Sequence, residues 1–203
     1  MLSVSLQENF PLSSNPCQHL ICTNRKFLLY EKLQWEFNHD MSENITITKV
    51  SYSKQRDRKV LQSCLKNWFS DPKALNLTDP RMNYPFRFEK WVKLSYSEGE
   101  KKTWILRENE WIVAYLSLSF VPEENRGHLF HLYVDREHRK RGYARKLMHQ
   151  AESWAIDRNC THLTLRVFSG NEPALKLYNS LGFELTSKKE KNNLAMAKTL
   201  LDS

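Results

Sequence analysis

The segment 128–158 constrains the fold more than any other part of the chain. An apolar, strand-like run ends at Val134, and a helix is predicted over 144–158 because apolar residues recur there at helical spacing. That apolar stripe consists of Leu147, Met148, Ala151, Trp154 and Ala155. Between strand and helix lies HRKRGYARK, and residues 136–146 hold six Lys or Arg side chains against the single carboxylate of Glu137. Since like charges this close repel one another, the loop indicates a binding site for an anion.

The start of the predicted helix has the chemistry of such a site. Helix N-termini present unpaired backbone N–H groups and the positive end of the helix dipole. Gly142 allows a tight turn without a side chain between those amides and a phosphate, and Ala144 keeps the approach open. The loop does not have the GxxxxGK[ST] spacing of a Walker-type nucleotide loop. From spacing alone, a solvated basic turn before an amphipathic helix stays open as the alternative.

The periodicity of apolar residues predicts the remaining elements. Strands are predicted over 45–50, 102–107, 111–120, 128–134, 162–167, 183–186 and 194–200, and further helices over 53–69, over 86–96 and between Asn171 and Gly182. The buried side of the first helix is expected to carry Val60, Leu61, Leu65 and Trp68, and Asp71-Pro72 should end it. The order β-α-α-β-β-β-α-β-α-β-β predicts a mixed α/β domain whose central sheet combines antiparallel and parallel pairs.

Composition narrows the class of protein. A chain of 203 residues with 40% hydrophobic residues can form one domain with a sizeable core. The net charge of +8 suggests an anionic partner, for which a phosphorylated cofactor, nucleic acid and a membrane surface all qualify. Nucleic acid is disfavoured because only Tyr143 interleaves with the loop cations. No apolar run has the length of a membrane span, and the N-terminus does not resemble a secretory signal. We therefore expect a cytoplasmic protein with no membrane partner.

The four cysteines form no CxxC pair and match no common zinc spacing, which predicts idle thiols in a reducing compartment and no metal. The domain boundary is expected near Met41. Residues 1–41 are polar and turn-rich apart from a helix predicted over 24–39, and Met41-Ser42-Glu43-Asn44 resembles a natural protein start before the strand 45–50. We predict an N-terminal extension over 1–41, either an appendage or the product of an early start codon, followed by the functional domain over 42–203.

The motif Arg139-x-x-Gly142-x-Ala144 resembles the (Q/R)-x-x-G-x-(G/A) signature of the GNAT (GCN5-related) N-acetyltransferase superfamily. The downstream stretch LRVFSGNEPALKLYNSLGFE resembles the second signature of that family, and the resemblance covers roughly residues 45–200. It implies the GNAT fold, with helices on both faces of the mixed sheet. It also implies acetyl-CoA as co-substrate and direct transfer of the acetyl group to a primary amine in a ternary complex.

The resemblance assigns the cofactor-binding residues. The pyrophosphate is expected on the backbone amides of the loop, through Arg139, Lys140, Arg141, Gly142, Tyr143, Ala144 and Arg145. The pantetheine arm is expected beside Leu132, Tyr133 and Val134, on a strand that splays from its neighbour. The N–H of Leu132 is expected to polarise the acetyl carbonyl. Plain core packing is the other interpretation of Leu132 and Val134, and both can hold at once.

Three further positions have a catalytic and a structural interpretation. Asn171 lies near the cofactor arm in the family, or it only caps a helix. Tyr178 protonates the departing thiolate, or it packs in the apolar stripe of its helix. His128 is the candidate general base, or it is a solvent-facing strand histidine. A metal site at His128 and His131 is disfavoured because the cluster offers no third ligand. Arg166 stands where some relatives carry a Glu, which argues against the subgroup that acetylates ribosomal proteins.

The acceptor is not identified by the fold or the cofactor. In the family, the first two helices and their connection shape the acceptor site, which places it over 53–96. The aromatics there are Trp68, Phe69, Tyr84, Phe86 and Trp91. A small-molecule amine and a protein amine both remain open, although the net charge disfavours a polycationic acceptor. A catalytically inactive acyl-CoA-binding module is the alternative function, and a homodimer stays open.

Overall fold

The computed structural model of the chain describes residues 44–190 and 192–200. The predicted N-terminal extension and its helix over 24–39 lie outside these residues. The strands are β1 (Ile45–Val50), β2 (Lys101–Glu108), β3 (Trp111–Val121), β4 (Arg126–Val134), β5 (His162–Phe168), β6 (Glu184–Glu190) and β7 (Asn193–Thr199). The helices are α2 (Gln55–Trp68), α3 (Pro72–Thr78), α4 (Phe88–Ser95), α5 (Tyr143–Ile156) and α6 (Glu172–Ser180), with 3₁₀ turns η1 (Pro122–Glu124) and η2 (Arg136–His138).

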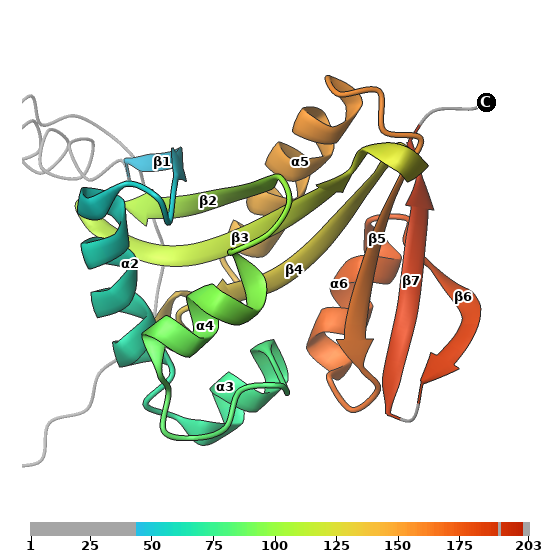
Figure 1. Ribbon diagram of the computed structural model, residues 1–203. Coiled ribbons are helices and arrows are strands. Elements are labelled where there is room, and N and C mark those ends of the chain that lie inside the picture. The colour runs from blue at the N-terminus through green and yellow to red at the C-terminus, as the bar shows by residue number, and fades with distance from the viewer. Residues whose placement is uncertain (1–43, 191, 201–203) are drawn as a thin grey trace, which may run out of the picture. The chain divides into compact units, whose positions relative to one another are not determined.

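The strands form one seven-stranded sheet in the order β1-β2-β3-β4-β5-β7-β6. Neighbouring strands pair antiparallel except β4 and β5, which are parallel and are joined by the crossover helix α5 (Figure 1). The mixed sheet predicted from the sequence is therefore confirmed, as are all seven strands. The single parallel pair lies at the centre of the sheet, where the basic loop follows β4.

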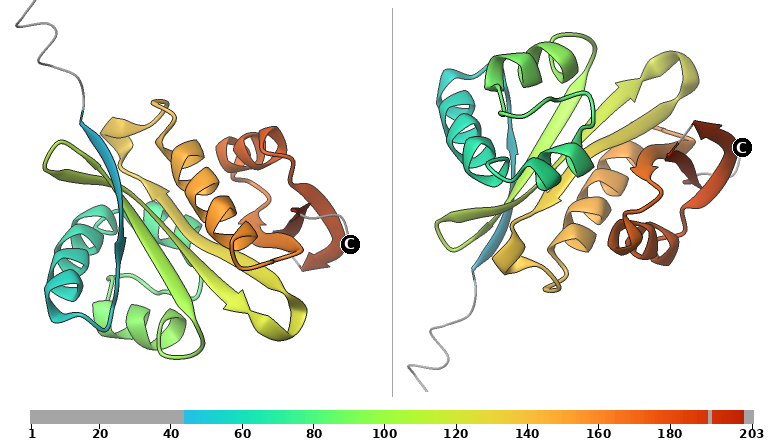
Figure 2. Two further views of the ribbon diagram at one scale, coloured as in Figure 1. Left: turned by 90° about the horizontal axis from the view of Figure 1, so that it is seen from above. Right: turned by 90° about the horizontal axis from the view of Figure 1, so that it is seen from below.

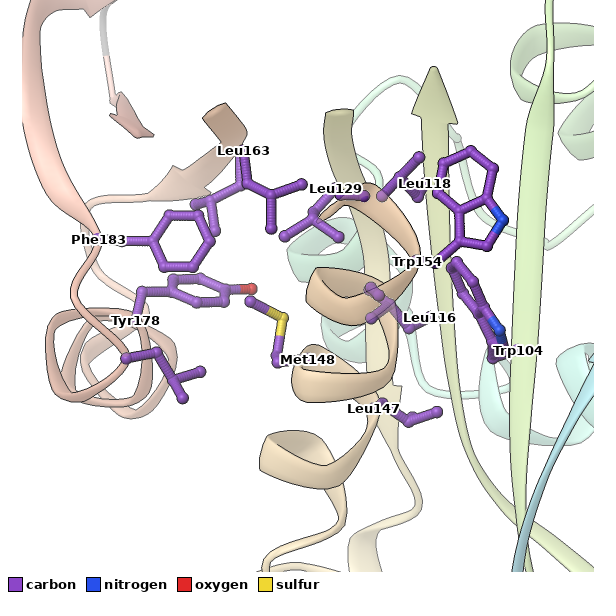
Figure 3. Close-up of a cluster of buried hydrophobic side chains, with 14 of the residues drawn as sticks. Trp104, Leu116, Leu118, Leu129, Leu147, Met148, Trp154, Leu163, Tyr178 and Phe183 are labelled. Atoms are coloured by element: carbon purple, nitrogen blue, oxygen red, sulfur yellow. The ribbon is translucent and has the colours of Figure 1, made fainter. Parts of the chain in front are cut away.

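Helices cover both faces of the sheet, as the resemblance implied. Figure 2 shows α2 and α4 on one side of the strands and α5 and α6 on the other. Each side has its own buried core. The predicted stripe of α5 is buried throughout and packs with Leu116, Leu118 and Leu163 of the sheet (Figure 3). On the opposite face, Leu61, Leu65 and Trp91 pack with aromatic side chains around Tyr115.

Two predictions about the helices between β1 and β2 are corrected by the structure. Val60 was predicted to face inward, but it is 37% exposed, and the buried stripe of α2 consists of Leu61, Leu65 and Trp68. Asp71-Pro72 does end α2, but it also begins α3, which the sequence analysis did not predict. The Asp71 carboxylate accepts a hydrogen bond from the Lys73 N–H at 2.8 Å, and Pro72 occupies the first helical position. A seven-residue helix that buries only Leu75 leaves no periodic pattern to detect.

A β-bulge in β4 changes which face its side chains occupy. Tyr115 of β3 lies opposite Tyr133, whereas Ser117 lies opposite Phe130, so β4 contains one extra residue in this interval. His131 lies in the interval and has a φ of 56°, in the left-handed region. Because side chains alternate along a strand, the extra residue reverses the alternation. Leu129 thus packs in the core beneath α5, whereas Tyr133, an even number of residues later, packs in the core beneath α2 and α4.

Beyond the bulge, β4 separates from β5. Their parallel register runs from Arg126 opposite His162 to Leu129 opposite Leu165 and includes no later residue of β4 in the described chain. Figure 1 shows the two strands diverging toward the end of β4 that leads to the basic loop. The splayed strand pair expected from the resemblance is therefore present. It leaves one edge of β4 unpaired with β5 directly before the start of α5.

Candidate active site

The basic loop folds into a concave turn at the start of α5. Lys140 and Gly142 both have left-handed backbones, with φ values of 64° and 81°, and α5 begins at Tyr143. In a tight turn where left-handed residues alternate with residues of negative φ, successive backbone N–H groups can point toward a common centre and form an anion-binding nest. Apart from Gly142 and its two chain neighbours, no heavy atom of the described residues lies within 4 Å of the position that a Cβ on Gly142 would take. The N-terminus of a 14-residue helix is therefore open to a ligand.

Glu108, at the end of β2, holds this loop in place. It accepts hydrogen bonds from the Tyr143 hydroxyl at 2.5 Å and from Arg141 Nη1 at 2.7 Å, and His138 Nε2 lies 3.1 Å from its other oxygen. The hydrogen bond from Tyr143, with the nearby charge of Arg141, lowers the pKa of the Glu108 carboxyl. The side chains of Arg141 and Tyr143 thus shape the loop, while the nest is formed by backbone. Sequence reasoning missed Glu108, because nothing local links a strand-end glutamate to a loop 33 residues away.

The other loop cations stay at the surface around the nest. Arg139 Nε donates to the Val134 carbonyl at 3.1 Å, and its guanidinium carbon lies 5.7 Å from the centre of the Tyr133 ring. Arg145 Nη2 donates to Ser180 Oγ at 2.7 Å, which ties the start of α5 to the end of α6. Lys140 is exposed, and Ala144 is half-buried in the first turn of the helix. Each predicted pyrophosphate-binding position therefore lies at or beside the nest.

A small cavity of about 90 Å³ lies where β4 and β5 separate. Three predicted site residues meet in its wall: Leu132 from β4, Asn171 at the start of α6, and Tyr178 within α6. The other two predicted strand residues are not part of the lining. Tyr133 packs in the core beneath α2 and α4, and Val134 packs against the core beneath α5.

Tyr178 and Asn171 each show the structural role that was left open for them. Tyr178 is 8% exposed and packs against Phe183, with ring centres 6.0 Å apart, and Figure 3 shows its ring directed toward Met148. Burial raises the pKa of Tyr178 to about 12, so its hydroxyl stays protonated and can donate. Asn171 caps α6 through a 3.4 Å hydrogen bond from the Ala174 N–H to Oδ1. Both side chains nevertheless line the cavity, so packing does not exclude a role at the site.

A much larger cleft of about 1140 Å³ extends from α3 and α4 across β4 and β5 to β7. It shares wall residues with the small cavity, among them Phe130, His131 and Arg166. The two spaces therefore meet at the bulge of β4. A molecule in the cleft can approach a group held in the small cavity. The predicted acceptor region contributes α3, the following turn and the end of α4, whereas Trp68, Phe69 and Trp91 are buried in the core.

His131, at the bulge, is fixed by partners on both ring nitrogens. Nε2 lies 3.0 Å from Asp79 Oδ2, and Nδ1 lies 2.9 Å from the Tyr96 hydroxyl. A carboxylate only accepts, so Nε2 carries the proton and Nδ1 accepts from Tyr96. Burial lowers the pKa of His131, which keeps the ring neutral. The ring also stacks on Trp91 at 3.9 Å. With both nitrogens engaged, His131 is suited to hold the bulge rather than to accept a proton.

The hydrogen bonds behind His131 run in one direction. Trp91 Nε1 donates to the Tyr52 hydroxyl at 2.9 Å, Tyr52 contacts the Tyr115 hydroxyl at 2.7 Å, and Tyr115 contacts the Tyr96 hydroxyl. Since Tyr96 donates its only hydroxyl proton to His131, each preceding hydroxyl must donate to the next. Asp79 ends the chain and also accepts two hydrogen bonds from the Arg81 guanidinium. Burial favours the neutral acid, but the bonds from Arg81 and His131 outweigh it and hold the pKa of Asp79 well below its usual range.

His128, the predicted base, lies in the wall of the large cleft. Its Nδ1 is 3.0 Å from Thr164 Oγ1, which also accepts from Arg126 Nη1 at 2.9 Å and lies 3.4 Å from the Gly127 carbonyl. All three contacts are satisfied if Nδ1–H donates to Thr164 and the hydroxyl donates to Gly127. That arrangement leaves Nε2 as a proton acceptor. Burial, and then the charges of Arg126, Arg166 and Lys101, lower the pKa of His128 to about 4.

Residues 44–190 and 192–200 contain no group of three or more His, Cys, Asp or Glu side chains arranged to hold a metal ion. Within the same part of the chain, no helix combines the length and the apolar character that crossing a bilayer requires.

Comparison with known proteins agrees with this geometry. The sequence profile of the Acetyltransferase (GNAT) family matches residues 63–183. N-acetyltransferase 8 from Homo sapiens is 32% identical over 101 residues, which cover 48% of this chain and 44% of the human protein. The chain therefore matches less than half the length of that relative.

Solved structures share the fold. A domain from Methanocaldococcus jannaschii DSM 2661 aligns with a TM-score of 0.64 at 20% identity, covering 78% of this chain and 100% of that domain. The PaiA N-acetyltransferase from Thermoplasma acidophilum, solved in complex with coenzyme A, aligns with a TM-score of 0.59 at 16% identity, covering 77% and 99% of the two chains. At these identities the alignments show the fold alone.

Because the pKa of His128 is depressed, we predict that acid begins to destabilise the protein at pH values higher than those at which carboxylates titrate. An unfolded histidine has a pKa near 6.5, whereas the folded value is about 4. Between these values the unfolded chain binds the proton and the folded chain does not, so the free energy of unfolding should fall as pH falls from about 6.5 to about 4. This group alone should contribute roughly 3 kcal/mol to the decrease.

Urea denaturation at several pH values tests this prediction. His128→Gln should flatten the pH dependence in that window, while part of it should remain because the pKa of His131 is also lowered. His149→Gln, on the exposed side of α5, is the matched control for the loss of one imidazole. A wild-type slope retained in His128→Gln would show that His128 is not held neutral.

Proposed function

Because the chain belongs to the GNAT acetyltransferase family, we propose that it transfers an acetyl group from acetyl-CoA to a primary amine by direct attack in a ternary complex. We assign this activity to residues 42–203. The observation that carries the proposal is the separation of β4 from β5, which opens a cavity lined by Leu132 and Tyr178 that adjoins the large cleft. The acetyl group and the amine thus enter from different sides and meet at the bulge.

The loop provides the binding energy for the nucleotide end of the co-substrate. The pyrophosphate is proposed to bind the backbone amides from Arg139 to Ala144, at the positive end of the α5 dipole. Lys140 and Arg145 lie beside it and add positive charge. Glu108 keeps the loop shape fixed before the ligand arrives, which lowers the conformational cost of binding. The pantetheine arm would then follow the edge of β4 that β5 leaves unpaired.

The bulge is proposed to provide the oxyanion donor. The pairing register of β3 with β4 skips His131 and Leu132, so the Leu132 N–H lies in the irregular part of the strand and beside the small cavity. A backbone N–H at this place can donate to the acetyl oxygen as negative charge develops on it. His131, held by Asp79 and Tyr96, keeps the bulge rigid and so keeps that donor in position.

The proposed reaction forms a C–N bond and breaks the thioester C–S bond. The neutral amine attacks the acetyl carbonyl, and the nitrogen then loses a proton to His128 Nε2 or to water. Coenzyme A leaves as a thiolate and takes up a proton to become a thiol. A base of pKa about 4 cannot deprotonate a free alkylammonium of pKa about 10. The amine must therefore arrive neutral, and His128 acts only once attack has made the nitrogen acidic.

Tyr178 is proposed to stabilise the departing sulfur. Its phenol, with a pKa of about 12, is a weaker acid than a thiol of pKa about 8.5. It therefore acts mainly as a hydrogen-bond donor to the developing thiolate. The alternative, an acyl-CoA-binding module without catalysis, would keep the loop and leave Tyr178 as a packing residue.

Substitutions at Gly142 test the loop. Gly142→Glu places a carboxylate where the pyrophosphate is expected, and CoA affinity measured by calorimetry should fall by at least about 100-fold, since an unpaired like charge costs several kcal/mol. Gly142→Ala adds the same backbone strain at φ 81° without the charge and is the matched control. CoA binding that is equal in the wild type and in folded Gly142→Glu would refute the loop assignment.

Tyr178→Phe separates catalysis from packing. The change removes one hydroxyl and keeps the ring against Phe183, so melting temperature and acetyl-CoA affinity should change little. If the hydroxyl donates to the leaving thiolate, the single-turnover rate of acetyl transfer should fall by about 10²–10³-fold, as for the loss of one donor to a developing negative charge. A rate within about twofold of wild type, far from that expected range, would leave Tyr178 as a packing residue and strengthen the alternative function.

A further inference from the structure

The large cleft and the small cavity share a stretch of wall, which we call the neck. Its described residues are Leu77, Thr78, Leu129, Phe130, His131, Leu165 and Arg166. Most of them are apolar, and the half-buried Leu77 and Phe130 come from different elements, α3 and β4. An amine in the cleft must pass the neck to reach an acetyl group in the small cavity. The neck therefore contacts whatever carries the nitrogen.

Apart from the Arg166 guanidinium, the neck has little hydrogen-bonding capacity to offer a ligand. The Thr78 hydroxyl donates its proton to the Ala74 carbonyl at 2.8 Å, and both ring nitrogens of His131 already have partners. Arg166 can also add the methylene groups of its side chain to the apolar wall. A polar group brought here would lose water without gaining a full set of new partners, which is costly. The neck therefore suits a hydrocarbon stem.

The outer part of the cleft is larger and more polar. At about 1140 Å³ the whole cleft exceeds the roughly 300–1,000 Å³ of small-molecule pockets. It reaches from α3 to the turn that joins β6 to β7, two segments that Figure 1 shows apart from one another. Asn76 lines it on α3, and Asn192 and Asn193 line it beside that turn. An amide side chain offers two donors and an acceptor, which match the groups of a peptide backbone.

We propose that the acceptor is the side-chain amine of a lysine within a polypeptide, with its four-carbon stem in the neck and the polypeptide backbone in the outer cleft. This inference rests on the proposed function. An N-terminal amine fits less well, because the carbon that bears its nitrogen also carries a peptide carbonyl, which would enter the neck. A small amine would leave most of the cleft unfilled.

The same neck favours the reactive form of lysine. A free lysine side chain is mostly protonated at neutral pH, since its pKa is about 10.4. Loss of water in an apolar neck disfavours the ammonium ion and so lowers the pKa of the bound amine. The amine can then release its proton to solvent before it attacks the acetyl group. No strong base is required in the cleft for this step.

Peptides that differ in the acceptor amine test the proposal, with acetyl-CoA and detection of the released thiol. The reference is acetyl-Ala-Ala-Lys-Ala-Ala-amide, in which ornithine or 2,4-diaminobutyrate replaces lysine to shorten the stem. The kcat/KM should fall by about tenfold or more from lysine to diaminobutyrate, because two methylenes leave the neck. Penta-alanine amide with a free N-terminus should be slower than the lysine peptide by a similar factor, although its amine is more often neutral. Butylamine, which lacks the polypeptide, should also be about tenfold slower.

Leu77→Ser tests the neck itself. The lysine-to-diaminobutyrate ratio of kcat/KM should fall by about fivefold, since the stem loses an apolar contact. Ile156→Ser is the matched control, because it removes an exposed apolar side chain of α5 outside the described lining of the cleft, and it should leave the ratio unchanged. Melting temperatures show whether each variant is folded, and Phe130→Ser replaces Leu77→Ser if the latter unfolds. An unchanged ratio in a folded neck variant would contradict the proposal.

The outcomes separate this inference from the function on which it rests. If diaminobutyrate, the N-terminal amine or butylamine reacts as fast as the lysine peptide, the lysine assignment is overturned while amine acetylation is confirmed. If no amine is acetylated, the proposed function fails, and the neck is tested by calorimetry in the presence of CoA. Tighter binding of the Nε-acetyllysine peptide than of its acetylated diaminobutyrate counterpart, with the difference reduced in Leu77→Ser, would still support the neck. Equal binding, or binding of neither, would overturn it.

Discussion

The contact between His131 and Asp79 is the interaction on which the rest of the site depends. It joins the bulge of β4 to the end of α3 across 52 residues of sequence and holds a non-glycine residue at a φ of 56°. A left-handed backbone at a non-glycine residue costs of order 1–3 kcal/mol and persists only where its surroundings fix it. Here the fixing groups are Asp79, Tyr96 and the ring of Trp91. The bulge reverses which face of the sheet the β4 side chains occupy, and it lies where β4 separates from β5. The small cavity and the contribution of β4 to both cores therefore depend on it.

Charge is arranged in two separate regions around that bulge. Backbone amides and loop cations form one region at the start of α5, and their shape is maintained by buried Glu108. Cations in the wall of the large cleft form the other. In both regions carboxylates bind some of the cations: Glu108 binds Arg141 in the loop, and Asp79 binds Arg81 in the cleft.

The sequence correctly predicted the features that depend on neighbouring residues alone. The strand, loop and helix around Gly142 are set by periodicity and by one glycine, and all seven strands and the buried stripe of α5 were found this way. What it missed depends on contacts between distant segments. Glu108 and Asp79 reach partners 33 to 52 residues away, and α3 is too short to show a period. The prediction that Val60 faces inward was wrong because an apolar residue at the edge of a helix stripe can face either the core or the solvent.

The crystal structure of the protein with coenzyme A tests the central claim most directly, namely that the separation of β4 from β5 is the cofactor site. The account predicts the pyrophosphate against the amides of Arg139 to Ala144 and the sulfur between Leu132 and Tyr178. It also predicts a bulge at His131 that is unchanged from the free protein. Coenzyme A bound elsewhere, or β4 paired with β5 beyond Leu129 in the complex, would contradict it.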